Sequence, residues 1–331
     1  MPSSTQFYLP IIDISAFTAP DDDDDIIKNN KKIQTAKKIH EACRDVGFFY
    51  LTGHNVPQEI SDQVLNLGNE FFQLDDKEKM KLSIANEDMA RGYQKLGENV
   101  TRYQKDWHEA LDFYKPISSD HYLAKNNLPL RGQNQWPIYP TEFQQVFERY
   151  TEYMKELGLK VMSAIALGLG LEENYFEQFL DDSFWVMRVI GYPPLKSAES
   201  ANRVGISCGE HTGNLDSTKG ALQVQTKEGE WINADHIPGT FVVNIGDMLN
   251  VWTNNVYQST LHRVVHKGDN YRVSVPFFYE PNFEAKIEPL QPCLDIDPVK
   301  HHEPVIYAER RTLLSGGHYT SMHSTDNDSD H

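Results

Sequence analysis

The chain lacks the features that mark disulfide-stabilised and membrane-spanning proteins. Its 331 residues include only three cysteines, Cys43, Cys208 and Cys293, and no two of them form a CxxC pair. This spacing argues against a disulfide framework and a zinc ribbon and fits a reducing compartment. No run of about 18 apolar residues occurs, and no basic segment followed by an apolar one opens the chain. We therefore predict a soluble, cytoplasmic protein that has no membrane partner.

Positive charge is also scarce. Lys and Arg number 31 against 48 Asp and Glu, which gives a formal net charge of −17. Such a chain repels phosphate backbones, so nucleic acid is excluded as a partner. The aspartates at 21–25 account for part of this acidity and are interpreted as a solvated surface segment. The chain also has no Gly-rich dinucleotide fingerprint after a predicted strand and no phosphate-binding loop of the GxxxxGK[S/T] type.

Apolar spacing divides the chain into a helical part and a strand-rich part. The period of three to four residues from Thr141 to Leu169 predicts one long helix. After Phe184, short β-branched and aromatic runs alternate with Gly, Pro, Asn and Asp, which is typical of a sandwich or barrel. These strands are predicted at 185–192, 221–225, 240–245, 259–266 and 272–279.

Four regions are predicted from these patterns. Residues 1–140 form an N-terminal region of helices and strands, and residues 141–180 contain the long central helix. Residues 181–290 form the barrel. Residues 291–331 contain a last helix, from about Pro304 to Leu314, and a disordered tail that is rich in Ser, Thr, Asp and His.

Two histidines, an arginine and a serine stand out in the strand-rich part. His211 and His262 each fall within or at the end of a predicted strand, among small polar residues. Arg272 and Ser274 are two residues apart on a strand, so both project from the same face and can bind a small carboxylate together. If residues 266–270 form a hairpin loop, His262 faces Ser274 across two paired strands, although a slip of one residue would reverse this.

In this order and spacing, these residues resemble the iron(II)- and 2-oxoglutarate-dependent oxygenases of the isopenicillin N synthase-like superfamily. The similarity extends over nearly the whole chain. The matching segments include residues 10–13, 46–54, 91–93, 134–137, 192–194, 222–224, 238–247, 259–265 and 271–278.

The resemblance implies a mainly β fold with flanking helices, in which a double-stranded β-helix, or jelly roll, forms the core. It implies that His211 and His262 bind iron(II) and that Arg272 and Ser274 bind the distal carboxylate of 2-oxoglutarate, with Tyr192 near this co-substrate. The implied reaction uses dioxygen to oxidise a small organic molecule by hydroxylation, desaturation or cyclisation, and it releases succinate and carbon dioxide.

The match fails at one iron ligand. Members of this family carry His-x-Asp, whereas this chain reads His211-Thr212-Gly213, and the segment that follows is about half a dozen residues short. The core is therefore predicted to lack one strand after His211.

Four interpretations of this departure remain open. The polypeptide is a catalytically impaired isoform that lacks a short segment, or Asp216 supplies the missing carboxylate. Alternatively, iron has an open position, as in halogenases of similar fold, or the chain is a non-catalytic binding protein.

Overall fold

The largest element of the fold is a nine-stranded β-sheet. The computed structural model describes residues 8–20, 25–86, 90–98, 100–101, 104–120, 125, 130, 132–194, 212–214, 220–266 and 268–308. The strands of this sheet are β1 (Ile11–Asp13), β2 (Phe48–Thr52), β3 (Gly92–Gln94), β6 (Glu109–Tyr114), β7 (Trp185–Tyr192), β8 (Thr212–Asn214), β11 (Phe241–Asn244), β13 (Arg272–Ser274) and β14 (Phe277–Tyr279). They pair in the order β1-β2-β11-β8-β14-β7-β6-β3, and β13 also pairs with β7.

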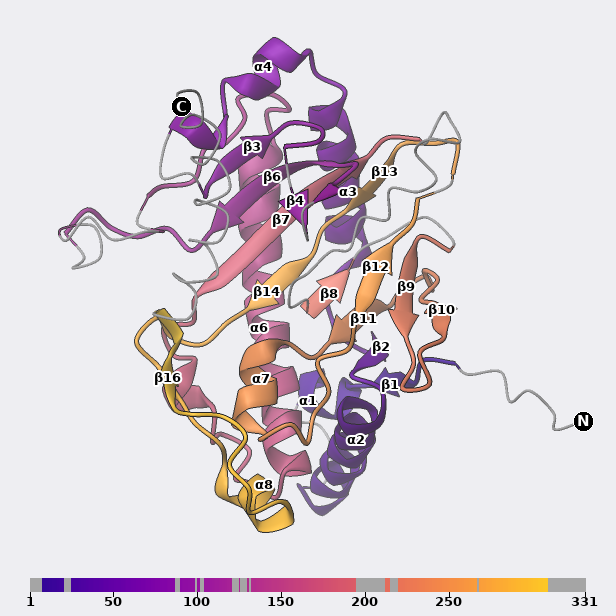
Figure 1. Ribbon diagram of the computed structural model, residues 1–331, viewed down its shortest axis with the longest axis vertical. Coiled ribbons are helices and arrows are strands. Elements are labelled where there is room, and N and C mark those ends of the chain that lie inside the picture. Colours follow the sequence, from indigo (N-terminus) through magenta and orange to yellow (C-terminus); the bar gives the residue numbers. More distant parts are fainter. Residues whose placement is uncertain are drawn as a thin grey trace, which may run out of the picture.

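A smaller sheet faces part of the large one (Figure 1). It consists of β9 (Leu222–Gln225), β10 (Trp231–Asn233) and β12 (His262–Val264), in the order β10-β9-β12. Two further pairs lie outside these sheets: β4 (Val100–Thr101) with β5 (Gln104–Lys105), and β15 (Lys286–Ile287) with β16 (Val305–Ile306).

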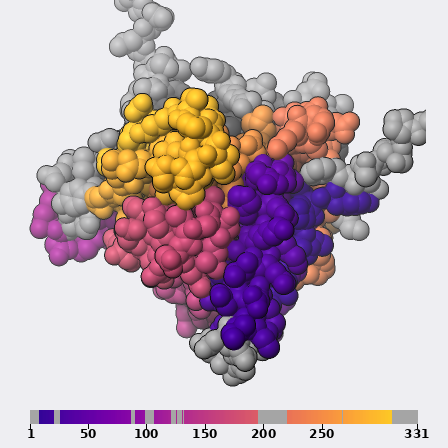
Figure 2. Space-filling view, turned by 90° about the horizontal axis from the view of Figure 1, so that it is seen from below, coloured from indigo at the N-terminus to yellow at the C-terminus, as the bar shows by residue number. Residues whose placement is uncertain are grey.

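Three helices, α2 (Asp25–Asp45), α3 (Gln58–Phe72) and α6 (Phe143–Gly168), contact strands of the large sheet, and the other helices lie around them. Those are α1 (Ser15–Thr18), α4 (Asp76–Met80), α7 (Asp247–Trp252) and α8 (Gln291–Ile296), with short 3₁₀ turns at Ile84–Asn86 and Glu177–Phe179. Both α2 and α3 pack against α6, and Figure 2 shows α2 and α6 side by side. Among the described residues, no helix is long and apolar enough to cross a membrane.

The strand-rich half and the long helix predicted from the sequence are confirmed. The helix predicted at 141–169 is α6, and the runs at 185–192, 221–225, 240–245 and 259–266 contain β7, β9, β11 and β12. The run at 272–279 forms two strands rather than one, because Pro276 cannot donate a backbone hydrogen bond to a continuous ladder.

Side chains alternate between two cores along the strands. On β7, Met187 and Val189 pack toward the helices, whereas Ile190 and Tyr192 belong to a second cluster between the two sheets. The remaining members of this second cluster are Leu9, Phe48, Tyr50, Leu222, Val224, Ala234, Val242 and Val264. We call the space around the second cluster the barrel interior. The fold is thus mainly β with flanking helices, as predicted.

The prediction that the core lacks a strand after His211 is wrong, because a short strand occupies that position in the sheet. Residues 212–214 form β8, which pairs with β11 through Val242 and Val243 and with β14 through Phe277. Without β8, the facing edges of β11 and β14 would leave their backbone donors and acceptors unsatisfied inside the sheet. The shortened chain therefore fills this position with a strand of only three residues.

The prediction of a helix from about Pro304 is also wrong for its first residues, which form a strand. Val305 and Ile306 form β16, which pairs antiparallel with Lys286 and Ile287 of β15. A strand is favoured at this point because it satisfies the backbone groups along β15. The predicted tail from Ser315 onward lies outside the described residues.

Candidate active site

His262 lies in the barrel interior at the start of β12. It is two residues before Val264, so both side chains project from the same face of the strand. The side chain is buried, and its ring lies against Phe48 with centroids 5.2 Å apart. Nδ1 lies 3.2 Å from the carbonyl oxygen of Thr260, and if Nδ1 carries the proton, Nε2 keeps its lone pair for a metal. Burial lowers the pKa of His262, which favours the neutral imidazole that iron binding requires.

Arg272, Ser274 and Tyr192 meet on one face of the large sheet. Arg272 pairs with Tyr192, and Ser274 pairs with Ile190, so both side chains share the barrel interior. Arg272 is fully buried, and its guanidinium lies 4.6 Å from the centre of the Tyr192 ring. A buried guanidinium beside a buried hydroxyl suits a carboxylate, which accepts two parallel hydrogen bonds from arginine.

The predicted hairpin between β12 and β13 does not form. β12 pairs with β9, where His262 is opposite Val224, whereas β13 pairs with β7 in the other sheet. In a jelly roll, consecutive strands cross from one sheet to the other, so they face each other instead of pairing. His262 and Arg272 therefore line the same interior from opposite walls. The predicted hairpin also placed them in one interior, but on neighbouring strands of one sheet.

The rest of the expected iron site lies partly outside the described residues. His211 and Asp216 are both in this category, as is Cys208. Gly213 lies in the middle of β8 and carries no side chain that could bind a metal. Within the described ranges, no group of three or more His, Cys, Asp or Glu residues is arranged to bind a metal. The one described donor, His262, has the burial and hydrogen bonding that an iron ligand needs.

The barrel interior also contains a charged pair that the sequence did not reveal. Asp112 on β6 is opposite Arg188 on β7, and Arg188 Nε donates to Asp112 Oδ1 at 2.8 Å. Arg188 is two residues before Ile190, so the pair projects into the same space as Arg272. His108 joins this group, because its ring lies 5.5 Å from that of Tyr192. No sequence signal joins these residues, since 76 positions separate Asp112 from Arg188.

A second buried network supports the strand that carries Arg272. The Tyr271 hydroxyl donates to Glu109 Oε1 at 2.7 Å, and Lys79 Nζ donates to Glu109 Oε2 at 2.8 Å. Glu109 and Asp112 are three positions apart on β6, so their side chains project from opposite faces of the sheet. This network ties the residue next to Arg272 to α4 from outside the barrel interior.

Burial at His108 makes the stability of the protein depend on pH. Burial, with a smaller contribution from Arg188, lowers the pKa of His108 to about 3. Between pH 6.5 and about 3, the unfolded chain therefore binds a proton at this residue that the folded protein does not bind. The free energy of unfolding should fall by up to about 1.4 kcal/mol for each unit that the pH drops in this window. Urea unfolding at pH 6 and pH 5 measures the slope, and His108→Phe should reduce it by about 1 kcal/mol per pH unit. An unchanged slope in this variant would contradict the assignment.

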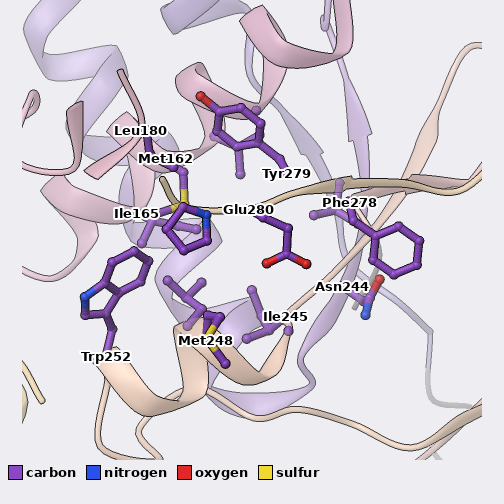
Figure 3. Close-up of a pocket in the computed structure, with 16 residues that line it drawn as sticks. Met162, Ile165, Leu180, Asn244, Ile245, Met248, Trp252, Phe278, Tyr279 and Glu280 are labelled. Atoms are coloured by element: carbon purple, nitrogen blue, oxygen red, sulfur yellow. The ribbon is translucent and has the colours of Figure 1, made fainter. Parts of the chain in front are cut away.

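An apolar cavity of about 70 Å³ lies elsewhere, between α6, α7 and the ends of β11 and β14. Figure 3 shows Trp252, Met248, Met162 and Ile165 around it, with the carboxylate of Glu280 directed inward. None of the predicted site residues lines this cavity. Its volume suits only a few water molecules, so we do not assign the substrate to it.

Family comparisons agree with this geometry. Residues 9–138 match the N-terminal domain family described as non-haem dioxygenase in morphine synthesis, and residues 186–281 match the 2OG-Fe(II) oxygenase superfamily. The chain is 43% identical over 312 residues to a homoarginine-6-hydroxylase, 2-ODD-233, from Oryza sativa subsp. japonica, with 91% of this chain and 94% of the relative covered. The chain belongs to the 2OG-Fe(II) oxygenase superfamily.

Other members of the superfamily support the same assignment. A homoarginine-6-hydroxylase from Glycine max, 2-ODD-C23, is 42% identical, with 85% of this chain and 88% of the relative covered. A full-length Neurospora crassa protein, solved in complex with alpha-KG, has a TM-score of 0.80 at 27% identity, with 95% of this chain and 97% of that one covered. JOX2 in complex with 2OG, Fe and JA has a TM-score of 0.72 at 26% identity, with 92% of this chain and 84% of that one covered.

These relatives also establish the class of reaction. The chain is a 2-oxoglutarate-dependent dioxygenase that uses iron(II) and 2-oxoglutarate and oxidises a small organic molecule. The halogenase-like and non-catalytic alternatives find no support among the relatives described above.

Proposed function

We propose that this oxygenase hydroxylates a basic amino acid of the homoarginine type. Support comes from its 43% identity, over nearly its whole length, to a rice enzyme named homoarginine-6-hydroxylase. The barrel interior supports the same class, because it contains the buried carboxylate of Asp112 together with the guanidinium groups of Arg188 and Arg272. A substrate that carries both charges can find partners there.

In this proposal, His211 and His262 hold iron(II), and Arg272 and Ser274 hold the distal carboxylate of 2-oxoglutarate. The single observation that carries this assignment is the full burial of Arg272 beside Ser274, on the wall opposite His262. Tyr192 lies against the Arg272 guanidinium and limits its movement. When bound, iron(II) and 2-oxoglutarate supply the oxidising chemistry with dioxygen, and the barrel interior excludes bulk water and orients the substrate.

The activity test uses purified protein with iron(II), 2-oxoglutarate, dioxygen and L-homoarginine. We expect a product heavier by one oxygen atom, together with an equal amount of succinate, measured by mass spectrometry. A panel of L-arginine, L-lysine and thymine tests the alternatives, and thymine is included because a structure of the Neurospora crassa protein contains it. Succinate release that no basic amino acid stimulates would contradict the proposed substrate class.

Position 213 offers a direct test of the missing ligand. Gly213→Asp restores the His-x-Asp spacing. A carboxylate added to the two neutral imidazoles as a third ligand should tighten iron(II) binding by at least about tenfold. The measurement is an iron(II) titration of the variant beside the wild-type protein and Gly213→Asn, which has nearly the same size and no charge. Equal affinities for all three proteins would mean that position 213 does not face the iron.

We further propose that the protein works in the cytosol and uses dioxygen there. Cys43 and Cys293 are both buried and unpaired by disulfides, which suits a reducing compartment.

A further inference from the structure

We propose that Asp112 and Arg188 form the receptor for the head group of an α-amino acid, with Asp112 binding the α-ammonium and Arg188 binding the α-carboxylate. This inference rests on the proposed function, and it assigns the part of the site that selects the substrate. An α-amino acid carries one cation and one anion on the same carbon atom. It therefore requires an acceptor and a donor that are as close together as the carboxylate and guanidinium of this pair.

The pair is built into the wall of the barrel rather than onto its surface. The two residues are opposite each other on β6 and β7, which pair over six residues. The side chain of Asp112 is only 4% exposed, whereas that of Arg188 is 23% exposed. Because Arg188 projects toward the barrel interior, this exposure means that accessible space borders its guanidinium on that side.

Arg188 keeps binding capacity for a ligand. Within the described part of the chain, Nε of Arg188 donates to Asp112, and the terminal amino groups have no other side-chain acceptor. An arginine held by one nitrogen can still present two others to a carboxylate. A bound carboxylate would thus add to the ion pair with Asp112 instead of breaking it.

His108 lies beside the same space and has a ring nitrogen whose hydrogen bonding is incomplete among the described residues. The residue is 8% exposed, and its Nε2 is buried with no hydrogen-bond partner among the described residues. A buried ring nitrogen of this kind is costly unless a ligand or a water molecule completes its hydrogen bonding. Its ring contacts Tyr192, so His108 connects the charged pair to the residues assigned to 2-oxoglutarate.

The position of the pair fits a substrate with a long side chain. Arg188 precedes Tyr192 by four residues on β7, which corresponds to about 13 Å along the strand. A substrate whose head group binds at Arg188 therefore extends its side chain toward Tyr192 and Arg272. The far end of a lysine-length chain would be oxidised, and the head group would serve only for recognition.

Calorimetric titration with three probes tests this assignment without turnover. The probes are L-homoarginine, 5-aminopentylguanidine, which lacks the carboxylate, and 6-guanidinohexanoate, which lacks the α-ammonium. Each is titrated anaerobically into protein that contains 2-oxoglutarate and iron(II). We expect wild-type protein to bind L-homoarginine at least about tenfold more tightly than either analogue.

Two variants test the roles of the Arg188 guanidinium and the Asp112 carboxylate separately. Arg188→Met should weaken L-homoarginine and 6-guanidinohexanoate by at least about tenfold and leave 5-aminopentylguanidine nearly unchanged. Asp112→Asn should weaken the two probes that carry the ammonium and spare 6-guanidinohexanoate. If Asp112→Asn does not fold, the double variant Asp112→Asn/Arg188→Met removes the pair without leaving one charge unpaired. The control is Asp182→Asn, which removes an ion pair with Lys115 at the surface, just beyond the C-terminal end of β6.

The outcomes distinguish this inference from the proposed function. Equal affinity of Arg188→Met and wild type for L-homoarginine would overturn the head-group receptor alone. Binding of 2-oxoglutarate without any of the three probes would overturn the proposed substrate class and this inference together. A weakening of all three probes and of 2-oxoglutarate in Arg188→Met would show a general structural role and would also overturn it.

Discussion

Replacement of Arg272 by alanine should weaken 2-oxoglutarate binding by roughly 30- to 4000-fold, because truncating one partner of a buried charge pair costs about 2–5 kcal/mol. Arg272 is fully buried, so its removal leaves a buried carboxylate of 2-oxoglutarate without the cation assigned to it. Anaerobic calorimetry with 2-oxoglutarate measures the loss directly. The Michaelis constant for 2-oxoglutarate should rise in parallel in any turnover assay.

Arg263→Ala provides a matched control. Arg263 follows His262 on β12 and projects from the opposite face, where it lies over Trp231 and donates to Gln223. Its removal also truncates an ordered arginine on a strand, but outside the barrel interior. If Arg263→Ala weakened 2-oxoglutarate binding as much as Arg272→Ala, the loss would reflect general destabilisation and not a carboxylate site.

Replacement of His262 by alanine should lower iron(II) affinity by at least roughly 100-fold and reduce succinate release to background, because even groups that only orient a metal ligand typically contribute about 10- to 100-fold to affinity. Loss of the ligand itself should cost more. The effect should also be larger than in an intact three-ligand site, because position 213 supplies no carboxylate. Equilibrium dialysis with iron(II) measures the affinity.

His54→Ala is the control for this variant. The pKa of His54 is also lowered by burial, its Nε2 lies 3.2 Å from the carbonyl oxygen of Gly239, and its ring packs on Phe241. It therefore resembles His262 in its hydrogen bond and ring contact, although it is only half-buried, and Phe241 belongs to the core on the helix side of the sheet. Iron affinity that fell equally in both variants would remove His262 from the metal site.

Short-range patterns in the sequence predicted most of the fold and one wall of the site. The three-to-four residue spacing along 141–169 identified α6 because a helix presents one face to the core at that period. Alternation along a strand correctly placed Arg272 and Ser274 on one face. Both patterns depend only on residues close together in the chain.

The pairing of strands that are far apart in the sequence could not be predicted as well. The sequence suggested a hairpin for β12 and β13, since a short loop at 266–270 could join them, but the jelly roll sends these strands to opposite sheets. Likewise, Asp112 and Arg188 are ordinary strand residues in the sequence, and only the register of β6 against β7 brings them together. The strand β8 was also not predicted, because Gly213 and Asn214 have little intrinsic strand preference and the segment forms a strand through its two neighbours.

The most direct test of the central claim is an anaerobic titration of the wild-type protein with iron(II) and 2-oxoglutarate, followed by visible absorption. The account predicts a weak charge-transfer band that saturates at one iron per chain and disappears in both Arg272→Ala and His262→Ala. A flat spectrum from wild-type protein whose circular dichroism shows a folded chain would contradict it. In that case, the two histidines and the arginine would not form a working site without a carboxylate at position 213.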